Sequence, residues 1–251
     1  MLSLSRSLQR RGTRALVLAL LLTGIACSPS PAAAPTPQAT APPSPPAHEE
    51  RTPAGVFGEE HWQWLERAGR EETEKPEVVI GAMNLKDGDV VAEIGAGTGF
   101  FSRRLARAVA PTGKIYANDI QPGMLDKLRE FAGKEGITNI VPVLGTETDL
   151  KLPAGQMDWV LLVDVYHEFQ KPEEMLAAIR KALKPNGRVA LVEYRLEGDS
   201  ASHISLPHRM SVEQVLAEWE PAGFTLVETV ETLPAQHLFL FSLRRGARAT
   251  P

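Results

Sequence analysis

Residues 93–106 read EIGAGTGFFSRRLA, and this stretch decides the fold class. A short apolar run that ends at Glu93 is predicted as a strand, and a helix is predicted to begin at Phe100. Between them lie three glycines: Gly95, Gly97 and Gly99. Glycine permits a tight turn and a close approach of the backbone to a ligand, and the following helix points its N-terminus at that ligand. The stretch therefore predicts a strand, a ligand-binding turn and a helix.

The rest of the chain alternates between predicted strands and helices. The predicted strands are Val90–Ile94, Lys114–Asp119, Ile140–Leu144, Trp159–Val163, Arg188–Glu193, Thr225–Val230 and His237–Leu243. The predicted helices cover 58–72, 76–85, 100–110, 122–136, 172–183 and 212–222. The residues KPNG at 184–187 are expected to form a turn. Alternating strands and helices predict a parallel sheet covered on both faces, and the last strand is expected to run antiparallel because no helix precedes it. The predicted fold is α/β, with a Rossmann-like, doubly wound sheet of seven strands.

The N-terminal residues have the order of a secretory signal. A basic segment is followed by the apolar run ALVLALLL at 15–22 and by small residues. This run is shorter than the ~20 residues of a typical membrane span. The stretch LLTGIAC, which ends at Cys27, resembles a bacterial lipoprotein signal. The resemblance implies export and a lipid anchor on Cys27 in the cell envelope, at the periplasmic face of the outer membrane. The alternatives are an ordinary signal peptide, an uncleaved anchor, or a misassigned start of a cytoplasmic enzyme.

Proline and alanine dominate the residues after Cys27. Eight of the 20 prolines lie within 28–47, a stretch without charge or large apolar side chains. Such a composition cannot form a core and predicts an extended spacer. The predicted organisation is a signal peptide at 1–26, a lipidated Cys and disordered linker at 27–54, a globular domain at 55–245 and a tail at 246–251.

The composition excludes several classes of function. The 251 residues include 27 Lys and Arg against 31 Asp and Glu, without a long basic run, so no nucleic-acid partner is expected. The single cysteine excludes a disulfide framework and a cysteine-based zinc site. The chain is therefore acidic overall, and its chemistry must come from side chains other than cysteine.

Asp119 ends the second predicted strand, 20 residues after Gly99. A carboxylate at this place accepts hydrogen bonds from the hydroxyls of a ribose, although a helix N-cap is the simpler alternative. The glycine spacing is GxGxG, and Phe100 stands where a dinucleotide site places its third glycine. This departure argues against a pyrophosphate held tightly at the helix, and it makes an NAD(P)-dependent oxidoreductase the minor alternative.

Five motifs, taken in order, resemble the class I S-adenosylmethionine-dependent methyltransferases over residues 70–245. They are EIGAGTG, NDIQPGML, DWVLLVDVYHEF, LKPNG and the late AGF. The resemblance implies a methyltransferase that uses S-adenosyl-L-methionine as its cofactor. A catalytically idle binding domain of the same fold is the alternative. The predicted export motivates it, because this cofactor is made in the cytoplasm.

The resemblance also assigns residues to the methionine end of the cofactor. Glu93 and the backbone around Gly95 and Gly97 would hold the amino-acid group, and Gly99 would complete the turn. Asp164, at the end of the fourth strand, would lie beside the methionine part. The alternative for the glycines and Glu93 is a purely structural role in the turn.

The adenosine end is assigned in the same way. Asp119 would bind the ribose, and Ile120 would flank the adenine. Thr146 stands after the third strand, where the family usually has an acid or Asn for the adenine amino group. That contact is therefore expected from Thr146 itself, from Glu147 or from Asp149.

Methyl transfer from a sulfonium is an in-line displacement, and no metal is expected for it. The protein aligns the acceptor with the methyl group, and a hydroxyl acceptor also needs a base. The candidate bases are His167 and Glu168, after the fourth strand, and His203 and His208, after the fifth. A free imidazole titrates near pH ~6.5, which suits a base, although a loop histidine without a role is the alternative. Aromatic faces favour a sulfonium, and the candidates near strand ends are Phe100, Phe101, Trp159 and Tyr166, with ordinary core packing as the favoured alternative for Phe101 and Trp159.

The expected acceptor is a small molecule, lipid-like or quinone-like. Methylation through a cysteine adduct is excluded because Cys27 is remote, and no D/N-P-P-Y/F tetrapeptide is present for amino groups of nucleic acid bases. The segment from Trp62 to Pro76 is expected either to cover the cofactor as a lid or to pack at the sheet edge.

Overall fold

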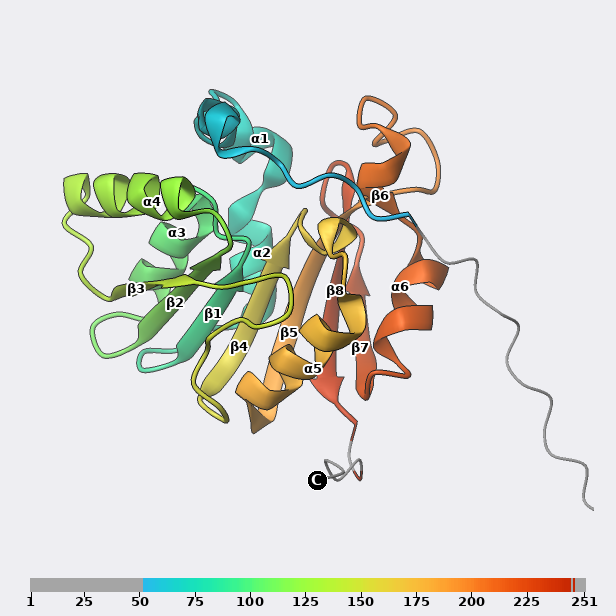
Figure 1. The fold of residues 1–251 in the computed structure, drawn as a ribbon. Helices are drawn as coiled ribbons and strands as arrows, with labels where there is room; N and C mark the ends of the chain where they lie inside the picture. The colour runs from blue at the N-terminus through green and yellow to red at the C-terminus, as the bar shows by residue number, and fades with distance from the viewer. Residues whose placement is uncertain (1–51, 245, 247–251) are drawn as a thin grey trace, which may run out of the picture. The chain divides into compact units, whose positions relative to one another are not determined.

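A computed structural model describes residues 52–244 and 246, which form one sheet with helices around it (Figure 1). The strands are β1 Val90–Ile94, β2 Lys114–Asp119, β3 Ile140–Leu144, β4 Met157–Val163, β5 Leu183–Arg195, β6 Arg209–Met210, β7 Phe224–Val230 and β8 Gln236–Leu243. The α-helices are α1 Arg70–Glu74, α2 Pro76–Met83, α3 Phe100–Ala108, α4 Pro122–Lys134, α5 Pro172–Ala182 and α6 Val212–Trp219. The 3-10 helices are η1 Glu59–Glu66, η2 Tyr166–Glu168 and η3 Leu206–His208. The predicted signal peptide, Cys27 and residues 28–51 of the predicted linker lie outside the described residues.

The strand order is β3-β2-β1-β4-β5-β8-β7, with β6 paired to β5 beside this path. Strands β1 to β5 run parallel, and β8 is antiparallel to both β5 and β7. The predicted Rossmann-like, mostly parallel sheet with an antiparallel last strand is therefore confirmed. The direction of winding reverses between β1 and β4, which is where sheets of this kind bind ligands, at the carboxyl ends of the strands.

Two predictions within the sheet differ from the structure. The sheet has eight strands instead of seven, because the two-residue β6 pairs with the end of β5. A strand this short has no alternation that a sequence pattern could reveal. The predicted turn KPNG lies within β5, where the pairing with β4 jumps from Met157–Leu183 to Trp159–Arg188. Residues 184–187 therefore leave the regular ladder while the strand continues on either side.

The helix predicted over 58–72 is divided into two parts. The 3-10 helix η1 ends at Glu66 and α1 begins at Arg70, and between them Gly69 has a φ of 80°. Arg67 is extended, which ends η1, and Gly69 in its left-handed conformation precedes the first residue of α1. The chain turns at Gly69, and α1 then carries two buried charged residues, Arg70 and Glu74.

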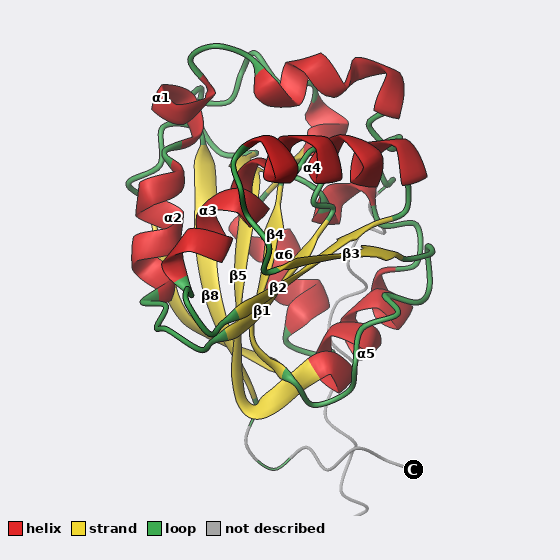
Figure 2. Ribbon diagram, turned by 90° about the vertical axis from the view of Figure 1, so that its left-hand side faces the viewer, coloured by secondary structure: helices red, strands yellow, loops and turns green. Residues whose placement is uncertain are grey.

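Helices cover both faces of the sheet (Figure 2). Helices α5 and α6 contribute Leu176, Ile179 and Trp219 to the core on one face. Helices α2 and α3 contribute Met83 and Leu105 to a second core on the other face. Helix α4 packs along β2 and β3. Within residues 52–244, none of the helices combines the length and the apolar composition needed to cross a bilayer.

Trp219 tests the core between α6 and the sheet. It is fully buried and stacks on Phe241, with ring centroids 4.7 Å apart. We expect Trp219→Ala to lower the free energy of unfolding by about 3–5 kcal/mol, because it leaves a cavity. Urea denaturation followed by circular dichroism measures this change. Val227→Ala, at a position 53% exposed on β7, is the control and should cost about 1 kcal/mol or less. Equal losses in the two variants would contradict this description of the core.

Candidate functional site

The glycine-rich turn after β1 is joined to the end of β2 by a backbone hydrogen bond, from the Ala96 N–H to the Asn118 carbonyl at 2.9 Å, and by a bond to the Asp119 side chain. The Gly97 N–H donates to Oδ2 of Asp119 at 2.8 Å, and the Gln121 N–H donates to Oδ1 at 2.9 Å. Asp119 is buried. Burial raises the pKa of Asp119 above its ordinary value, against the lowering effect of these backbone donors. The two features that the sequence singled out therefore form one structure.

The turn leaves no room for side chains at Gly95 and Gly97. Their φ angles are 69° and 53°, in the left-handed region that favours glycine. A Cβ on Gly95 would lie 2.4 Å from Cγ2 of Val165, and a Cβ on Gly97 would lie 2.7 Å from Cδ1 of Leu65. Both glycines are therefore required by the close approach of neighbouring segments.

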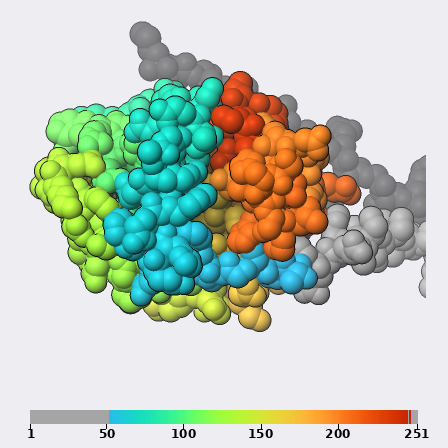
Figure 3. Space-filling view, turned by 90° about the horizontal axis from the view of Figure 1, so that it is seen from above, coloured from blue at the N-terminus to red at the C-terminus, as the bar shows by residue number. Residues whose placement is uncertain are grey.

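A cavity of about 330 Å³ lies at the carboxyl ends of β1, β2 and β4. Most of the predicted site residues line it: Glu93, Gly95, Gly97, Asp119, Ile120, Thr146, Glu147, Asp164, His167, Glu168, His203 and His208. Gly99 is not among the lining residues, because it precedes α3 and packs against Leu128 of α4. Figure 3 looks onto this end of the domain, where the N-terminal segment (blue) and the loop before β6 (orange) flank a recess.

Residues 54–74 lie over the cavity and not at the edge of the sheet. The Phe57 N–H donates to Oε1 of Glu168 at 3.1 Å, which ties the segment to the loop after β4. The Thr98 hydroxyl donates to Oε1 of Glu66 at 2.6 Å, which ties it to the turn after β1. Of the two alternatives for this segment, the geometry is that of a lid.

The charged groups that line the cavity are mainly acidic. Among the described residues that line it, Arg70 supplies the one guanidinium, and six side chains carry carboxyl groups: Glu74, Glu93, Asp119, Glu147, Asp164 and Glu168. Arg70 is itself engaged, because its Nε donates to Glu74 at 2.9 Å and its Cζ lies 4.1 Å from the centroid of the Phe100 ring. The cavity therefore favours a ligand with positive charge.

Two of these carboxyl groups, Glu93 and Asp164, lie at the ends of β1 and β4. Glu93, at the end of β1, is 3% exposed and accepts a hydrogen bond from the Ser102 hydroxyl, and burial raises its pKa to about 7. Asp164 follows β4 with a φ of 50°, and its Oδ1 is buried without a hydrogen-bond partner among the described residues. Burial, together with Glu74 and Glu193 nearby, raises the pKa of Asp164 well above its ordinary value. Both groups can receive a hydrogen-bond donor or a cation from a ligand.

The loop after β3 narrows the choice of an adenine contact. The Asp149 N–H donates to the Thr146 hydroxyl at 3.0 Å, so this hydroxyl holds the loop. The Asp149 carboxylate binds Nζ of Lys151 at 2.6 Å, and Asp149 does not line the cavity. The geometry therefore favours Thr146 and Glu147, which lie on the cavity wall, over Asp149 as the adenine contact.

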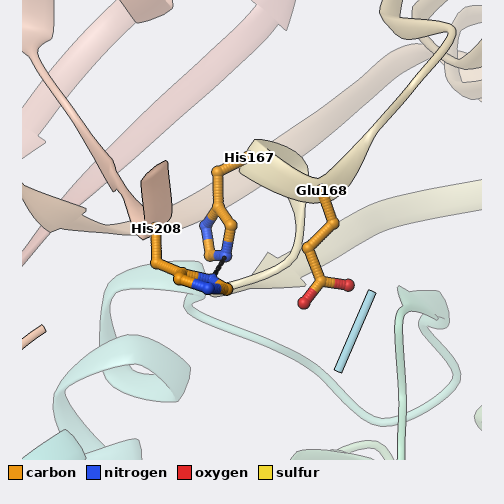
Figure 4. Close-up of side chains that lie close together, drawn as sticks. All are labelled: His167, Glu168 and His208. Atoms are coloured by element: carbon orange, nitrogen blue, oxygen red, sulfur yellow. Dashed lines mark hydrogen bonds between the residues drawn. The ribbon is translucent and has the colours of Figure 1, made fainter. Parts of the chain in front are cut away.

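Three side chains, Glu193, His167 and His208, form a chain of polar contacts that ends at the cavity wall, and Figure 4 shows its two histidines beside Glu168. Oε2 of Glu193 lies 2.6 Å from Nδ1 of His167, and Nε2 of His167 lies 3.0 Å from Nδ1 of His208. The Glu168 carboxylate points to the same side as the two imidazoles (Figure 4). The sequence analysis named His167, Glu168 and His208 but missed Glu193. The available signal was a single acid in the apolar run VALVEY of β5.

The two histidines have opposite tendencies to ionise. Burial lowers the pKa of His167, but the neighbouring Glu193 raises it, and the net pKa is above its ordinary value. Burial, aided by the charge of His167, lowers the pKa of His208. Burial raises the pKa of Glu168 to about 7. The pKa of His167 therefore lies above the ordinary value of a histidine, and that of His208 lies below it.

Two of the four aromatic candidates, Tyr166 and Trp159, do not line the cavity, and for Trp159 the alternative of core packing is confirmed. The Tyr166 hydroxyl donates to Glu218 at 2.6 Å and the ring packs on Trp219, while Trp159 belongs to the core beneath α2 and α3, and neither lines the cavity. Phe100 and Phe101 do line it. Further aromatic lining residues were missed: Phe57, Trp64, Phe169 and Tyr194.

Comparison with known proteins agrees with this architecture. Residues 91–187 match the family described as methyltransferase domain. Over 116 residues the chain is 30% identical to the ubiquinone/menaquinone biosynthesis C-methyltransferase UbiE of Burkholderia mallei and 31% identical to that of Burkholderia vietnamiensis. These matches cover 46% of this chain and 47% of each relative, so the chain spans about half the length of the curated relatives it matches. The solved structure of a SAM-dependent methyltransferase from Aquifex aeolicus is similar, with a TM-score of 0.68 at 25% identity over 75% of this chain and 100% of that one. Residues 91–187 are thus similar to a methyltransferase domain, and the fold is similar to that of a SAM-dependent methyltransferase.

Gly95→Ala tests the geometry of the turn. The added Cβ meets Val165 at a left-handed φ, so we expect the free energy of unfolding to fall by about 2–4 kcal/mol in urea denaturation. The matched control is Gly133→Ala in α4, where a Cβ meets nothing within 4 Å. Alanine is the better helix former, so the control should be neutral or stabilising by up to ~1 kcal/mol. Two variants with the same stability would show that Gly95 is not constrained in this way.

Glu93 makes stability depend on pH. Its pKa is about 7 in the folded chain and 4.5 ordinarily, so between these values the folded state holds a proton that the unfolded state has lost. The contribution of Glu93 to the free energy of unfolding therefore falls by on the order of 3 kcal/mol as the pH rises from about 4.5 to about 7. Arg70 lowers the pKa of Glu93 and Asp119 raises it. Both neighbours remain in the Glu93→Gln variant, so the variant removes only the titrating group. Denaturation at pH 5 and pH 8 should show Glu93→Gln gaining stability over the wild type at the higher pH. A constant difference between the two proteins would refute the assignment.

Proposed function

We propose that this chain transfers the methyl group of S-adenosylmethionine to a small-molecule acceptor in the cavity at the carboxyl ends of β1, β2 and β4. The charge of the cavity is the observation that carries the proposal. Six carboxyl groups and one guanidinium line it among the described residues. S-adenosylmethionine has a sulfonium and an ammonium group, which this lining attracts. The pyrophosphate of a nicotinamide dinucleotide would be repelled, which disfavours the oxidoreductase alternative.

The residues present fit this cofactor. A carboxylate has about four acceptor positions, and the Asp119 carboxylate uses two of them for the Gly97 and Gln121 N–H groups. Two positions remain for the hydroxyls of a ribose. The unpartnered Oδ1 of Asp164 and the buried carboxyl of Glu93 supply acceptors for the ammonium group. Gly95 and Gly97, where a Cβ would collide with its surroundings, allow the backbone to approach the ligand.

The cofactor supplies an activated methyl group: the acceptor bonds to the methyl carbon while the carbon–sulfur bond breaks and sulfur keeps the electron pair. The chain aligns the acceptor, and alignment at ~3–3.5 Å is worth on the order of 7–11 kcal/mol. The segment 54–74 limits access of water, because Leu65 lies against Gly97 and Phe57 against Glu168.

The histidine pair provides a base for the acceptor proton. The Glu193 carboxylate accepts the Nδ1 hydrogen of His167, so Nε2 of neutral His167 accepts the Nδ1 hydrogen of His208. Nε2 of His208 then carries a lone pair that can take a proton. Glu193 and His167 are positioning residues in this arrangement, since they fix the orientation of His208.

The acceptor class follows from the other cavity walls. Aromatic side chains from four segments line the cavity, including Phe57, Phe100 and Tyr194. Flat apolar walls beside a base suit a hydroxylated aromatic molecule such as a quinol. The proteins that match over 116 residues are named as C-methyltransferases of ubiquinone and menaquinone biosynthesis, which supports the same class.

Calorimetry of the full-length chain with S-adenosylmethionine and S-adenosylhomocysteine tests the proposal. We expect Asp119→Ala to weaken binding by at least about tenfold, because hydrogen bonds to a charged group contribute ~1.5–3 kcal/mol. The matched control is Asp149→Ala, since Asp149 lies near the cavity but binds Lys151. The control should bind like the wild type. No binding by the wild type would refute the proposal. Binding without methyl transfer to any quinol, phenol or lipid tested would indicate the idle domain instead.

A further inference from the structure

His167, Glu168 and His208 form the one cluster in residues 52–244 whose side chains could together hold a metal ion. Each offers one ligand atom, and these atoms lie within 4.8 Å of one another. Nε2 of His167 and Nδ1 of His208 are 3.0 Å apart. Two nitrogens bound to one metal ion at ~2.1 Å lie ~3.0 Å apart in octahedral and ~3.4 Å apart in tetrahedral geometry. The two imidazoles therefore already have the separation of ligands that share a metal.

A buried carboxylate orients the first of these histidines. Glu193 is fully buried, and its Oε2 lies 2.6 Å from Nδ1 of His167. An ionised carboxylate only accepts, so the hydrogen resides on Nδ1 and the lone pair resides on Nε2. Metal-binding histidines commonly donate their second ring N–H to a carboxylate in this way. Glu193 thus lies where it can support a metal ligand from outside, on β5, whereas the ligands lie in η2 and η3.

We propose that His167, Glu168 and His208 bind one divalent first-row metal ion, with zinc, manganese or iron(II) as the candidate class. The ion takes the place of the hydrogen shared between the two imidazoles, and the His208 hydrogen moves to Nε2. Two imidazoles and one carboxylate form a set of ligands that leaves further positions open. The surrounding acidic cavity also favours a cation.

The role of the ion rests on the proposed function. Its open positions face the cavity that the acceptor would enter, so an acceptor hydroxyl binds through its oxygen. A bound metal ion lowers the pKa of such an oxygen. With the ion bound, the acceptor loses its proton to water before methyl transfer and His208 serves as a ligand, so the role of His208 as a base belongs to the metal-free chain. The acceptor is therefore a molecule with a phenolic or enolic oxygen.

Sequence spacing could not reveal this site. His167 lies in η2 after β4 and His208 lies in η3 before β6, 41 residues apart. Such a separation matches no compact metal-binding motif, and the sequence analysis expected no metal. The pairing of β6 with β5 brings the two short helices together.

Metal titration tests the site independently of methyl transfer. The full-length chain, freed of metal by a chelator and without an affinity tag, is titrated with Zn²⁺ in a calorimeter and with Co²⁺ in a spectrophotometer. We expect one ion per chain. Glu193→Gln should weaken binding about 10–100-fold, because it alters only the support of His167. His208→Ala, which removes a ligand, should weaken it further.

The matched control is His203→Ala, since His203 lines the same cavity but lies outside the cluster. It should bind Zn²⁺ like the wild type. Zn²⁺ binding by His208→Ala as tight as that of the wild type would overturn the site, as would the absence of binding to the wild type. S-adenosylmethionine binding, measured on the same preparations, confirms that each variant is folded. Zn²⁺ binding without S-adenosylmethionine binding would refute the proposed function but not the metal site. S-adenosylmethionine binding without Zn²⁺ binding would refute only the metal site.

Discussion

The hydrogen bond from the Gly97 N–H to Asp119 is the contact on which the site depends. It fixes the turn after β1 against the end of β2, so the backbone of the turn and the carboxylate face one cavity. The bond requires Gly97 in a left-handed conformation and Asp119 in a buried position. Burying a carboxylate is costly unless it is hydrogen-bonded, and the donors at Gly97 and Gln121 offset that cost. The strand order also contributes to the site, because it places this turn at the point where the winding of the sheet reverses.

The cavity combines two kinds of surface that suit the two molecules proposed to meet there. Its floor, at the ends of β1 and β4, holds buried carboxyl groups that include Glu93 and Asp164. Its roof is the segment 54–74, which contributes aromatic and apolar side chains such as Phe57 and Leu65. The histidine pair lies on the remaining wall. The positively charged methyl donor would bind beside the carboxyl groups, and a flat apolar acceptor would bind beside the aromatic and apolar side chains.

Local patterns in the sequence predicted the parts of the site that are close together in the chain. Strands β1, β2 and β3 have the predicted bounds, and the turn and Asp119 lie where the glycine and acid spacing placed them. Contacts between distant segments were not predictable in this way. The direction of Tyr166 toward the core depends on the short helix η2, and the pairing of Glu193 with His167 depends on the neighbouring positions of β4 and β5. Periodicity carries no information on either.

A crystal structure of the full-length chain with S-adenosylhomocysteine tests the central claim most directly. The account predicts the ribose hydroxyls on the Asp119 carboxylate while the Gly97 N–H keeps its bond to the same group. It also predicts the amino group of the ligand beside Glu93 or Asp164. A ligand bound elsewhere, or an Asp119 side chain turned away from both the turn and the ligand, would contradict it.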